Sequence, residues 1–176
     1  TENTDEGRAV LRHSAAHVMA QAVLDLFPGA TFAIGPPITD GFYYDFDIGR
    51  PFTPEDIERI EARMAEIVAE DQSFERELLS IDEALEMFED QPFKTEIIRG
   101  VDEAEGAGEN EVSIYRNDAF VDLCRGPHIS STGRLKAVKL MRTAGAYWRG
   151  DENKPQLQRI YGTAWEDRKA LRKYLN

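Results

Sequence analysis

The sequence GFYYDFDIG, residues 41–49, sends successive side chains to opposite faces of an extended chain. One face would carry Phe42, Tyr44, Phe46 and Ile48, and the other Tyr43, Asp45 and Asp47. This period of two is typical of a strand with one buried face. A second strand is expected over residues 31–34, and the loop 35–41, which begins with Gly35-Pro36-Pro37, would join the two as a hairpin.

Helical patterns flank this hairpin on both sides. Before it, apolar residues recur at helical spacing over residues 8–26 and stop at Pro28-Gly29. After it, Thr53 is a typical N-cap and Pro54 is typical of a first helical position. We therefore expect an N-terminal helix packed on the sheet and a second helix that starts at residue 53.

The rest of the chain is predicted to be mostly strands. A capping box at residues 80–83 starts a short helix that ends at Phe88. Strands are expected over residues 74–79, 93–101, 112–116, 119–124, 135–142 and 157–161. A last helix is expected to begin near Trp165, and its pattern still continues at Asn176, as in a fragment of a longer protein. The predicted fold class is α+β, a single domain (residues 1–176) with a mostly antiparallel sheet, an N-terminal helix packed on it and a small α/β insertion at 53–100.

Charge is distributed unevenly along the chain. Residues 1–124 carry a net charge of −20 and residues 125–176 carry +8, for a total of −12. This acidic balance argues against an autonomous nucleic-acid-binding protein, although the basic last third could guide one stretch of phosphate backbone. A solvated charged surface would explain the same composition. A single cysteine excludes a disulfide framework and predicts a reducing, cytoplasmic location, and no apolar run approaches the roughly 20 residues that span a bilayer.

All three histidines and the single cysteine fall in two short motifs. His13-Ser-Ala-Ala-His17 lies in the first predicted helix, where residues four apart project from one face. Cys124-Arg-Gly-Pro-His128 follows a predicted strand, and its Gly-Pro pair predicts a turn. Asp122 lies two residues before Cys124, so both side chains leave the same face of that strand. Although a lone histidine or cysteine is more often a core residue, this concentration predicts one site built by both motifs.

Three chemistries suit these residues. One is a tetrahedral zinc site held by His13, His17, Cys124 and His128. Another is a hydrolytic pocket in which the imidazoles position and activate water, with Asp122 as a further base or orienting group. A Cys–His nucleophilic dyad is the weakest option, because nothing around Cys124 resembles a protease signature. Spacing alone does not separate the first two.

Beyond these motifs, the sequence resembles the editing domain of bacterial threonyl-tRNA synthetases, a module found in related form in alanyl-tRNA synthetases. The matching stretches follow one another through most of the chain: LRHSAAHVMAQAV, FAIGPPITDGFYYDFD, FVDLCRGPHI, KLMRTAGAYWRGD and QRIYGTAWEDRKAL. The resemblance implies a module that lies between a small N-terminal domain and a class II catalytic core. The chain would then be a fragment of a longer synthetase.

The activity that this resemblance implies is hydrolysis of mischarged seryl-tRNA(Thr) to serine and tRNA(Thr) by activated water, within a threonine–tRNA ligase. Serine lacks only the γ-methyl group of threonine, and one such group allows about 1–3 kcal/mol of discrimination, roughly 10–200-fold. A second, hydrolytic site that accepts serine and excludes threonine sterically would supply the remaining discrimination.

The resemblance also implies roles for single residues. Asp122 and Lys94 match the catalytic acidic and basic residues of the family, and His13 would position water or act as general base. The pocket and the substrate contacts would involve His17, Tyr44, Tyr115, Cys124 and His128. Simpler explanations exist for two of these residues: Tyr44 could be part of the core, and Lys94 could share a strand face with Glu96 as an exposed ion pair.

The two enzyme families that the sequence resembles differ in whether their editing domains hold a metal. The alanyl enzymes hold zinc with the equivalent four residues, whereas the threonyl enzymes are associated with water-mediated hydrolysis. We therefore expect editing to require no metal, while ATP and zinc would belong to the catalytic core. For the single-stranded 3′ end of tRNA(Thr), the candidates are Tyr147, Trp148 and Arg149. A buried Trp148 and a solvated Arg149 are the structural alternative.

Two further classes of function stay open. One is a structural zinc module that presents tRNA without catalysis, and zinc removal would then unfold the domain. The other is a free-standing editing factor, against which the unfinished C-terminal helix argues. The expected partners are the aminoacylated 3′ end of tRNA(Thr) and the rest of a synthetase, with no membrane.

Overall fold

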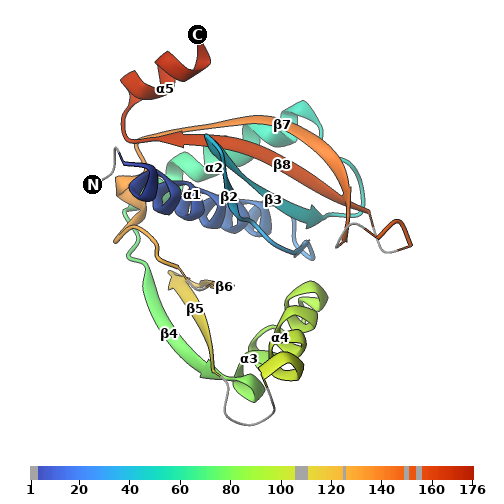
Figure 1. Ribbon diagram of the computed structural model, residues 1–176. Helices are drawn as coiled ribbons and strands as arrows, with labels where there is room; N and C mark the ends of the chain where they lie inside the picture. Colours follow the sequence, from blue (N-terminus) through green and yellow to red (C-terminus); the bar gives the residue numbers. More distant parts are fainter. Residues whose placement is uncertain (1–3, 106–110, 125, 149–150, 154–155) are drawn as a thin grey trace.

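The computed structural model describes residues 4–105, 111–124, 126–148, 151–153 and 156–176, with the backbone alone for residues 101–105. Its elements form two antiparallel sheets covered by helices (Figure 1). In chain order they are α1 (Asp5–Leu26), β1 (Thr31–Phe32), β2 (Pro37–Ile38), β3 (Gly41–Asp47), α2 (Pro54–Glu70), β4 (Glu75–Ser80), α3 (Ile81–Met87), α4 (Pro92–Glu105), β5 (Glu111–Asn117), β6 (Phe120–Leu123), η1 (Thr132–Arg134), β7 (Ala137–Tyr147), β8 (Gln156–Trp165) and α5 (Arg168–Leu175). The predicted α+β class is confirmed.

The larger sheet has the strand order β1-β3-β8-β7, and the short β2 also pairs with β3. β1 and β3 form the predicted hairpin, in which Phe32 lies opposite Phe46. The three aromatic residues of the buried face of β3 pack in one hydrophobic cluster with the apolar residues of α1. Helices α1 and α2 contact each other, and both lie along this sheet (Figure 1). The apolar face of β3 is therefore buried, as the alternating sequence of residues 42–46 predicted.

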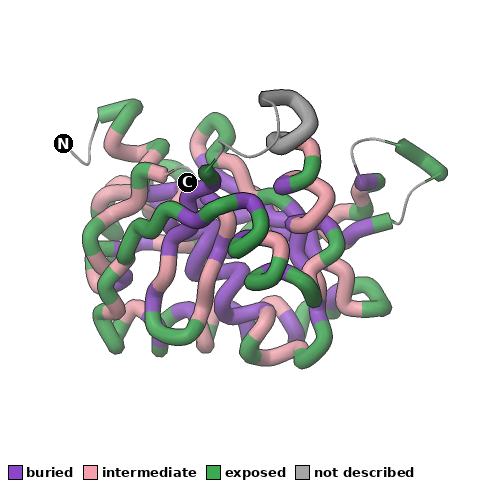
Figure 2. The backbone as a smooth tube through the Cα atoms, turned by 90° about the horizontal axis from the view of Figure 1, so that it is seen from below, coloured by how far each residue is buried: buried purple, intermediate pink, exposed green. Residues whose placement is uncertain are grey.

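Helix α1 is buried on almost every side. Its N-cap, Thr4, accepts a hydrogen bond from the backbone N–H of Gly7 at 3.0 Å. From Leu11 to Val23 every residue is buried except His13. Figure 2 shows such buried segments passing through the middle of the molecule and exposed residues around its edge. His13 is thus the one position between Leu11 and Val23 of α1 that is not buried.

The smaller sheet has the order β4-β5-β6 and lies beside α3 and α4, below the larger sheet in Figure 1. Its apolar residues, among them Leu79 and Ile114, belong to the same hydrophobic cluster as α1. The two sheets therefore share one core, with α1 between them. Of residues 53–100, those of α2 pack on α1, whereas β4 pairs with β5 beyond residue 100. The proposed insertion stays a prediction.

One predicted element is wrong, and the start of another differs by a few residues. Residues 93–101 are not a strand but part of α4, whose first turn contains Pro92 and whose Thr95 N–H donates to the carbonyl of Gln91 at 3.0 Å. The last helix does not begin at Trp165, because β8 continues to that residue and α5 starts after the N-cap Asp167. None of the described helices is long and apolar enough to cross a membrane.

Candidate functional site

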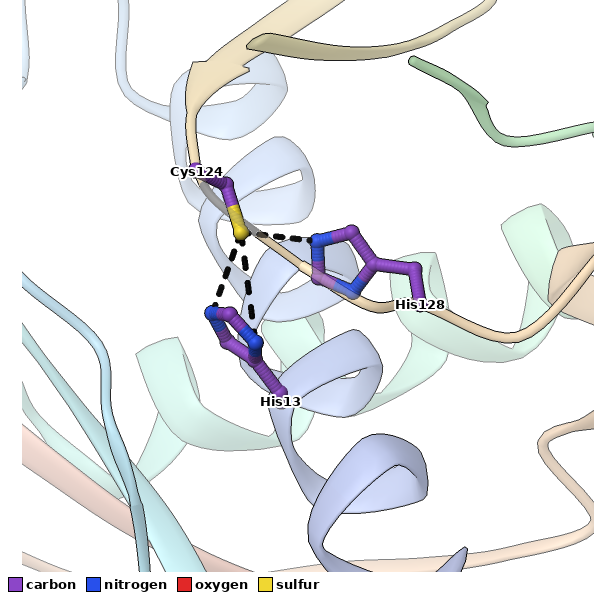
Figure 3. Close-up of side chains that lie close together, drawn as sticks. All are labelled: His13, Cys124 and His128. Carbon is purple, nitrogen blue, oxygen red and sulfur yellow. Dashed lines mark hydrogen bonds between the residues drawn. The ribbon is translucent and has the colours of Figure 1, made fainter. Parts of the chain in front are cut away.

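The two motifs meet between α1 and the segment that follows β6 (Figure 3). The sulfur of Cys124 lies 3.2 Å from Nε2 of His13 and 3.3 Å from Nε2 of His128. The rings of the two histidines have their centroids 4.6 Å apart. One turn of α1 and one turn of loop therefore bring three potential ligands to a single point.

His17 lies behind this group rather than in it. Its ring is 5.1 Å from the ring of His128, but its Nε2 is hydrogen-bonded to the side-chain oxygen of Asn117. Phe74 and Phe120 pack edge-on against it. The structure thus groups three of the four predicted ligands, and the fourth is turned toward a buried amide.

A second group of polar side chains faces the first across the pocket. The Nζ of Lys94 lies 2.8 Å from Oδ1 of Asp122 and donates to the Tyr44 hydroxyl at 2.7 Å. That hydroxyl donates in turn to Oδ2 of Asp122 at 2.7 Å. All three side chains are buried, and they come from α4, β3 and β6. They form a closed triangle of two hydrogen bonds and one ion pair.

The structure corrects the simpler explanations of Lys94 and Tyr44. Lys94 is only 2% exposed and lies on a helix, so it is not an exposed ion pair on a strand. Glu96, its supposed neighbour on that face, accepts a hydrogen bond from the indole of Trp148 instead. The ring of Tyr44 does pack in the core, stacked on Phe46, but its hydroxyl reaches the polar triangle.

Both groups line one pocket with a volume of about 330 Å³. His17 also lines it, and its remaining walls are small or apolar: Ile34, Gly35, Pro36, Ile97 and Leu123. Tyr115 stands outside this lining, where its ring packs edge-on against His128 with the centroids 4.3 Å apart. Tyr115 therefore supports a pocket residue instead of facing the pocket.

Burial keeps the titratable groups of the first cluster neutral. Desolvation lowers the pKa of His13, lowers that of His17 to about 4 and lowers that of His128 to about 2. The same cause raises the pKa of the Cys124 thiol to about 12. At neutral pH each of the three imidazoles is therefore uncharged, with one ring nitrogen that donates and one that accepts, and the cysteine is a thiol, a weak nucleophile.

The donor atoms of His13, Cys124 and His128 all lie within 4.8 Å of one another. Two imidazole nitrogens and one sulfur at such separations fit the ligand set of zinc, with a position left for water. The buried thiol would have to lose its proton when the ion binds. These three residues could therefore hold a metal, and His17 would not join them without breaking its bond to Asn117.

The three residues predicted to contact the 3′ end of tRNA have different outcomes in the structure. Trp148 is a core residue, 4% exposed, with its ring centroid 4.9 Å from that of Phe93. The prediction that Trp148 stacks on the bases of the 3′ end is therefore wrong. Tyr147 is exposed on β7, and Arg149 lies outside the described residues.

Several polar residues that bond to the histidines, or to the hydrogen-bond partner of His17, were not identified from the sequence. They are Ser14, Gln21, Gln72 and Asn117. Serine, glutamine and asparagine occur throughout the chain, so residue type alone distinguishes none of them. Only the first had a signal, since it lies inside the motif at residues 13–17.

The chain is similar in sequence to a known protein family and to several known proteins. Residues 112–161 match the family described as the threonyl and alanyl tRNA synthetase second additional domain. The chain is 56% identical over 175 residues to a threonine–tRNA ligase of Maridesulfovibrio salexigens, covering 98% of the chain and 26% of the relative. It is 52% identical over 188 residues to that of Thermobifida fusca, covering 98% of the chain and 28% of the relative. For the ligase of Pelobacter propionicus the identity is 56% over 178 residues, with coverage of 100% and 27%. The chain spans about a quarter of the length of these curated relatives.

Proposed function

Since this chain is homologous, over nearly its whole length, to the segment of threonine–tRNA ligases that carries the second additional domain, we propose that it is the editing domain of such a ligase. Its substrate is seryl-tRNA(Thr), and its products are serine and tRNA(Thr). The observation that carries the proposal is the pocket of about 330 Å³ between neutral His13 and the Lys94–Tyr44–Asp122 triangle. A pocket of this size with a few convergent polar groups is typical of a small-molecule site.

The reaction breaks the ester bond between the seryl carbonyl carbon and the terminal ribose oxygen. His13 orients the attacking water and accepts its proton, because its imidazole is neutral and half-buried at the pocket. Lys94, held by Asp122 and Tyr44, stabilises the negative charge that develops and assists proton transfer to the leaving oxygen. Cys124 stays a protonated thiol and forms no bond to the substrate.

Selection against threonine depends on the walls of the pocket. The γ-methyl group of threonine must be excluded by contact, because the hydroxyl groups of serine and threonine are chemically alike. When zinc occupies His13, Cys124 and His128, it supplies a Lewis acid that lowers the pKa of bound water. The proposed hydrolysis requires no metal.

The test compares hydrolysis of seryl-tRNA(Thr) and threonyl-tRNA(Thr), each with and without a chelator. Asp122→Asn and Lys94→Met should lose roughly 10²–10⁴-fold in rate, as acid–base groups do. Cys124→Ser should keep appreciable activity, and all three variants should still spare threonyl-tRNA. Circular dichroism checks that each variant folds, because one partner of a buried ion pair is removed. Serine covalently attached to Cys124 in a quenched reaction would overturn the mechanism.

The Cys–His cluster also supports a second candidate, a structural zinc module that presents tRNA without catalysis. This alternative predicts stoichiometric zinc in the purified protein and unfolding when a chelator removes it. The editing proposal predicts a folded, active domain in chelator. In either case the partners are the 3′ end of tRNA(Thr) and the remaining parts of a ligase, acting in the cytoplasm.

A further inference from the structure

Ser14 determines which nitrogen of His128 carries a proton. Its hydroxyl oxygen lies 2.9 Å from the Val10 carbonyl oxygen, 3.0 Å from the Ile129 backbone nitrogen and 2.9 Å from Nδ1 of His128. A carbonyl only accepts and a backbone N–H only donates, so the hydroxyl gives its one proton to Val10 and uses one lone pair for Ile129. The remaining lone pair accepts from His128, which must therefore be protonated on Nδ1. Its Nε2 lone pair then faces the sulfur of Cys124 at 3.3 Å.

A chain of amides determines the proton of His17 in the same way. The carboxylate of Glu70 only accepts, so the amide nitrogen of Gln72 must face it, at 2.5 Å. The oxygen of Gln72 is then an acceptor for Gln21 at 3.0 Å and for Asn117 at 2.7 Å. The oxygen of Gln21 accepts from the second N–H of Asn117 at 2.6 Å.

Both protons of the Asn117 amide are thereby used, and its oxygen is left to face His17. That oxygen can only accept, so His17 is protonated on Nε2. Its Nδ1 is then a lone pair, and it is a buried nitrogen without a hydrogen-bond partner among the described residues. The rings of His17 and His128 are in contact, yet they carry their protons on different nitrogens.

We propose that Ser14 and Asn117 are positioning residues that hold His128 and His17 in opposite, single tautomers. For the ring nitrogens of His13, the hydrogen bonds of the described residues include only the contact with the Cys124 sulfur. This arrangement, which rests on the proposed hydrolytic function, leaves His13 as the histidine that can take and release a proton during turnover. His17 and His128 then present fixed acceptors, and their protons do not move.

Nitrogen-15 NMR of histidine-labelled protein tests the tautomers directly. Long-range proton–nitrogen correlations distinguish the two neutral forms, and only three histidines need assignment. At a fixed pH of 7.5 in chelator, His17 should be protonated on Nε2 and His128 on Nδ1. Ser14→Ala should convert His128 alone to a mixture of tautomers, and Asn117→Leu should do so for His17 alone. A wild-type spectrum with either proton on the other nitrogen overturns the proposal, whether or not the variants fold.

Hydrolysis of seryl-tRNA(Thr) measures what the fixed tautomers contribute. Loss of partners that orient ligating or catalytic histidines typically costs about 10–100-fold, and we expect this loss in kcat/KM for both variants. The matched control is Thr163→Val, which removes another buried hydroxyl, one that bonds to the carbonyl of Asp40 and the indole of Trp165. It should leave both tautomers and the rate unchanged. Variants with altered tautomers and full activity would overturn the positioning role, whereas an inactive wild type with the expected spectrum would overturn only the proposed function.

Discussion

At the residue scale, Tyr44 joins the core of the molecule to its polar pocket. Its ring stacks on Phe46 with centroids 5.2 Å apart, and its hydroxyl bridges Lys94 and Asp122. A buried core ring thus helps to fix the place of the lysine head group. Any change that moves the ring must also disturb the triangle.

Gly35 provides a way to move that ring. A Cβ added there would fall inside the ring of Tyr44, so Gly35→Ala should push the ring aside and break both of its hydroxyl bonds. We expect the free energy of unfolding to fall by about 1–3 kcal/mol, as in other overpacked cores, and editing to fall with it. Urea unfolding and the seryl-tRNA(Thr) assay measure the two effects.

The control for this substitution is Gly100→Ala on α4, where an added Cβ meets nothing within 4 Å. That variant should be as stable as the wild type or up to about 1 kcal/mol more stable, because alanine favours a helix. Equal stability of Gly35→Ala and the wild type, with full editing activity, would contradict the predicted clash.

Sequence reasoning at this scale identified most of the polar residues that line the pocket and missed the residues that bond to its histidines. His13 and Cys124 stand out because their residue types are rare in the chain and closely spaced. Asn117 and Ser14 are of common types, and their importance comes from contacts with residues 100 and 114 positions away. Such contacts exist only after the fold has formed. Lys94 was named through a resemblance, since its own sequence neighbourhood carries no sign of a pocket.

At the element scale, α2 depends on an N-terminal carboxylate. Oδ2 of Asp56 accepts from the Thr53 backbone N–H at 2.8 Å and from Arg50 at 2.6 Å. These bonds, led by the one from Arg50, lower the pKa of Asp56 to about 2. The predicted N-cap Thr53 thus forms a capping box with Asp56, whose carboxylate the folded state keeps ionised.

Removal of this charge should make stability less dependent on pH. The pKa of Asp56 is lower in the folded chain than the value of about 3.9 in an unfolded one, so its stabilisation is present above that value and is lost as pH falls through about 2. Asp56→Asn should lower the free energy of unfolding by about 0.5–2 kcal/mol at pH 7, and the gap should close toward pH 2. Urea unfolding of both proteins across this range measures it, with Glu58→Gln on the same helix as an exposed control. If the two proteins differed in their free energy of unfolding by the same amount at every pH, the stabilisation could not come from the ionised carboxylate of Asp56.

The wrong prediction for residues 93–101 shows where local patterns fail. Thr95, Ile97 and Ile98 are β-branched and favour a strand, and the sequence was interpreted in that way. In the structure Phe93 and Ile97 pack in a small hydrophobic cluster with Ala33, Trp148 and Leu157. Lys94 and Ile98 are both buried as well. The buried residues thus recur at a spacing of four, which is the period of a helix. Pro92, at the first helical position, was the local signal for a helix. The hairpin of residues 31–48, by contrast, follows from a pattern that only a strand satisfies.

At the scale of the whole molecule, the net charge of −12 opposes binding to RNA. The free domain should bind uncharged tRNA(Thr) more weakly than about 1 μM at physiological salt, because acidic surface repels the phosphate backbone. Fluorescence anisotropy with labelled tRNA measures this affinity. Tight binding that persists at such salt would show that the basic residues of the last third act together on one face.

Because α1 is enclosed by both sheets and by α2, its backbone amides are shielded along the whole stretch from Leu11 to Val23. Deuterium can replace their protons only when the entire domain opens, so their exchange rates should report the global free energy of unfolding. The amides of α5, which buries no residue, should exchange far faster. The helix that carries His13 and His17 therefore opens only together with the whole domain, and its backbone keeps the two histidines in place for as long as the domain is folded.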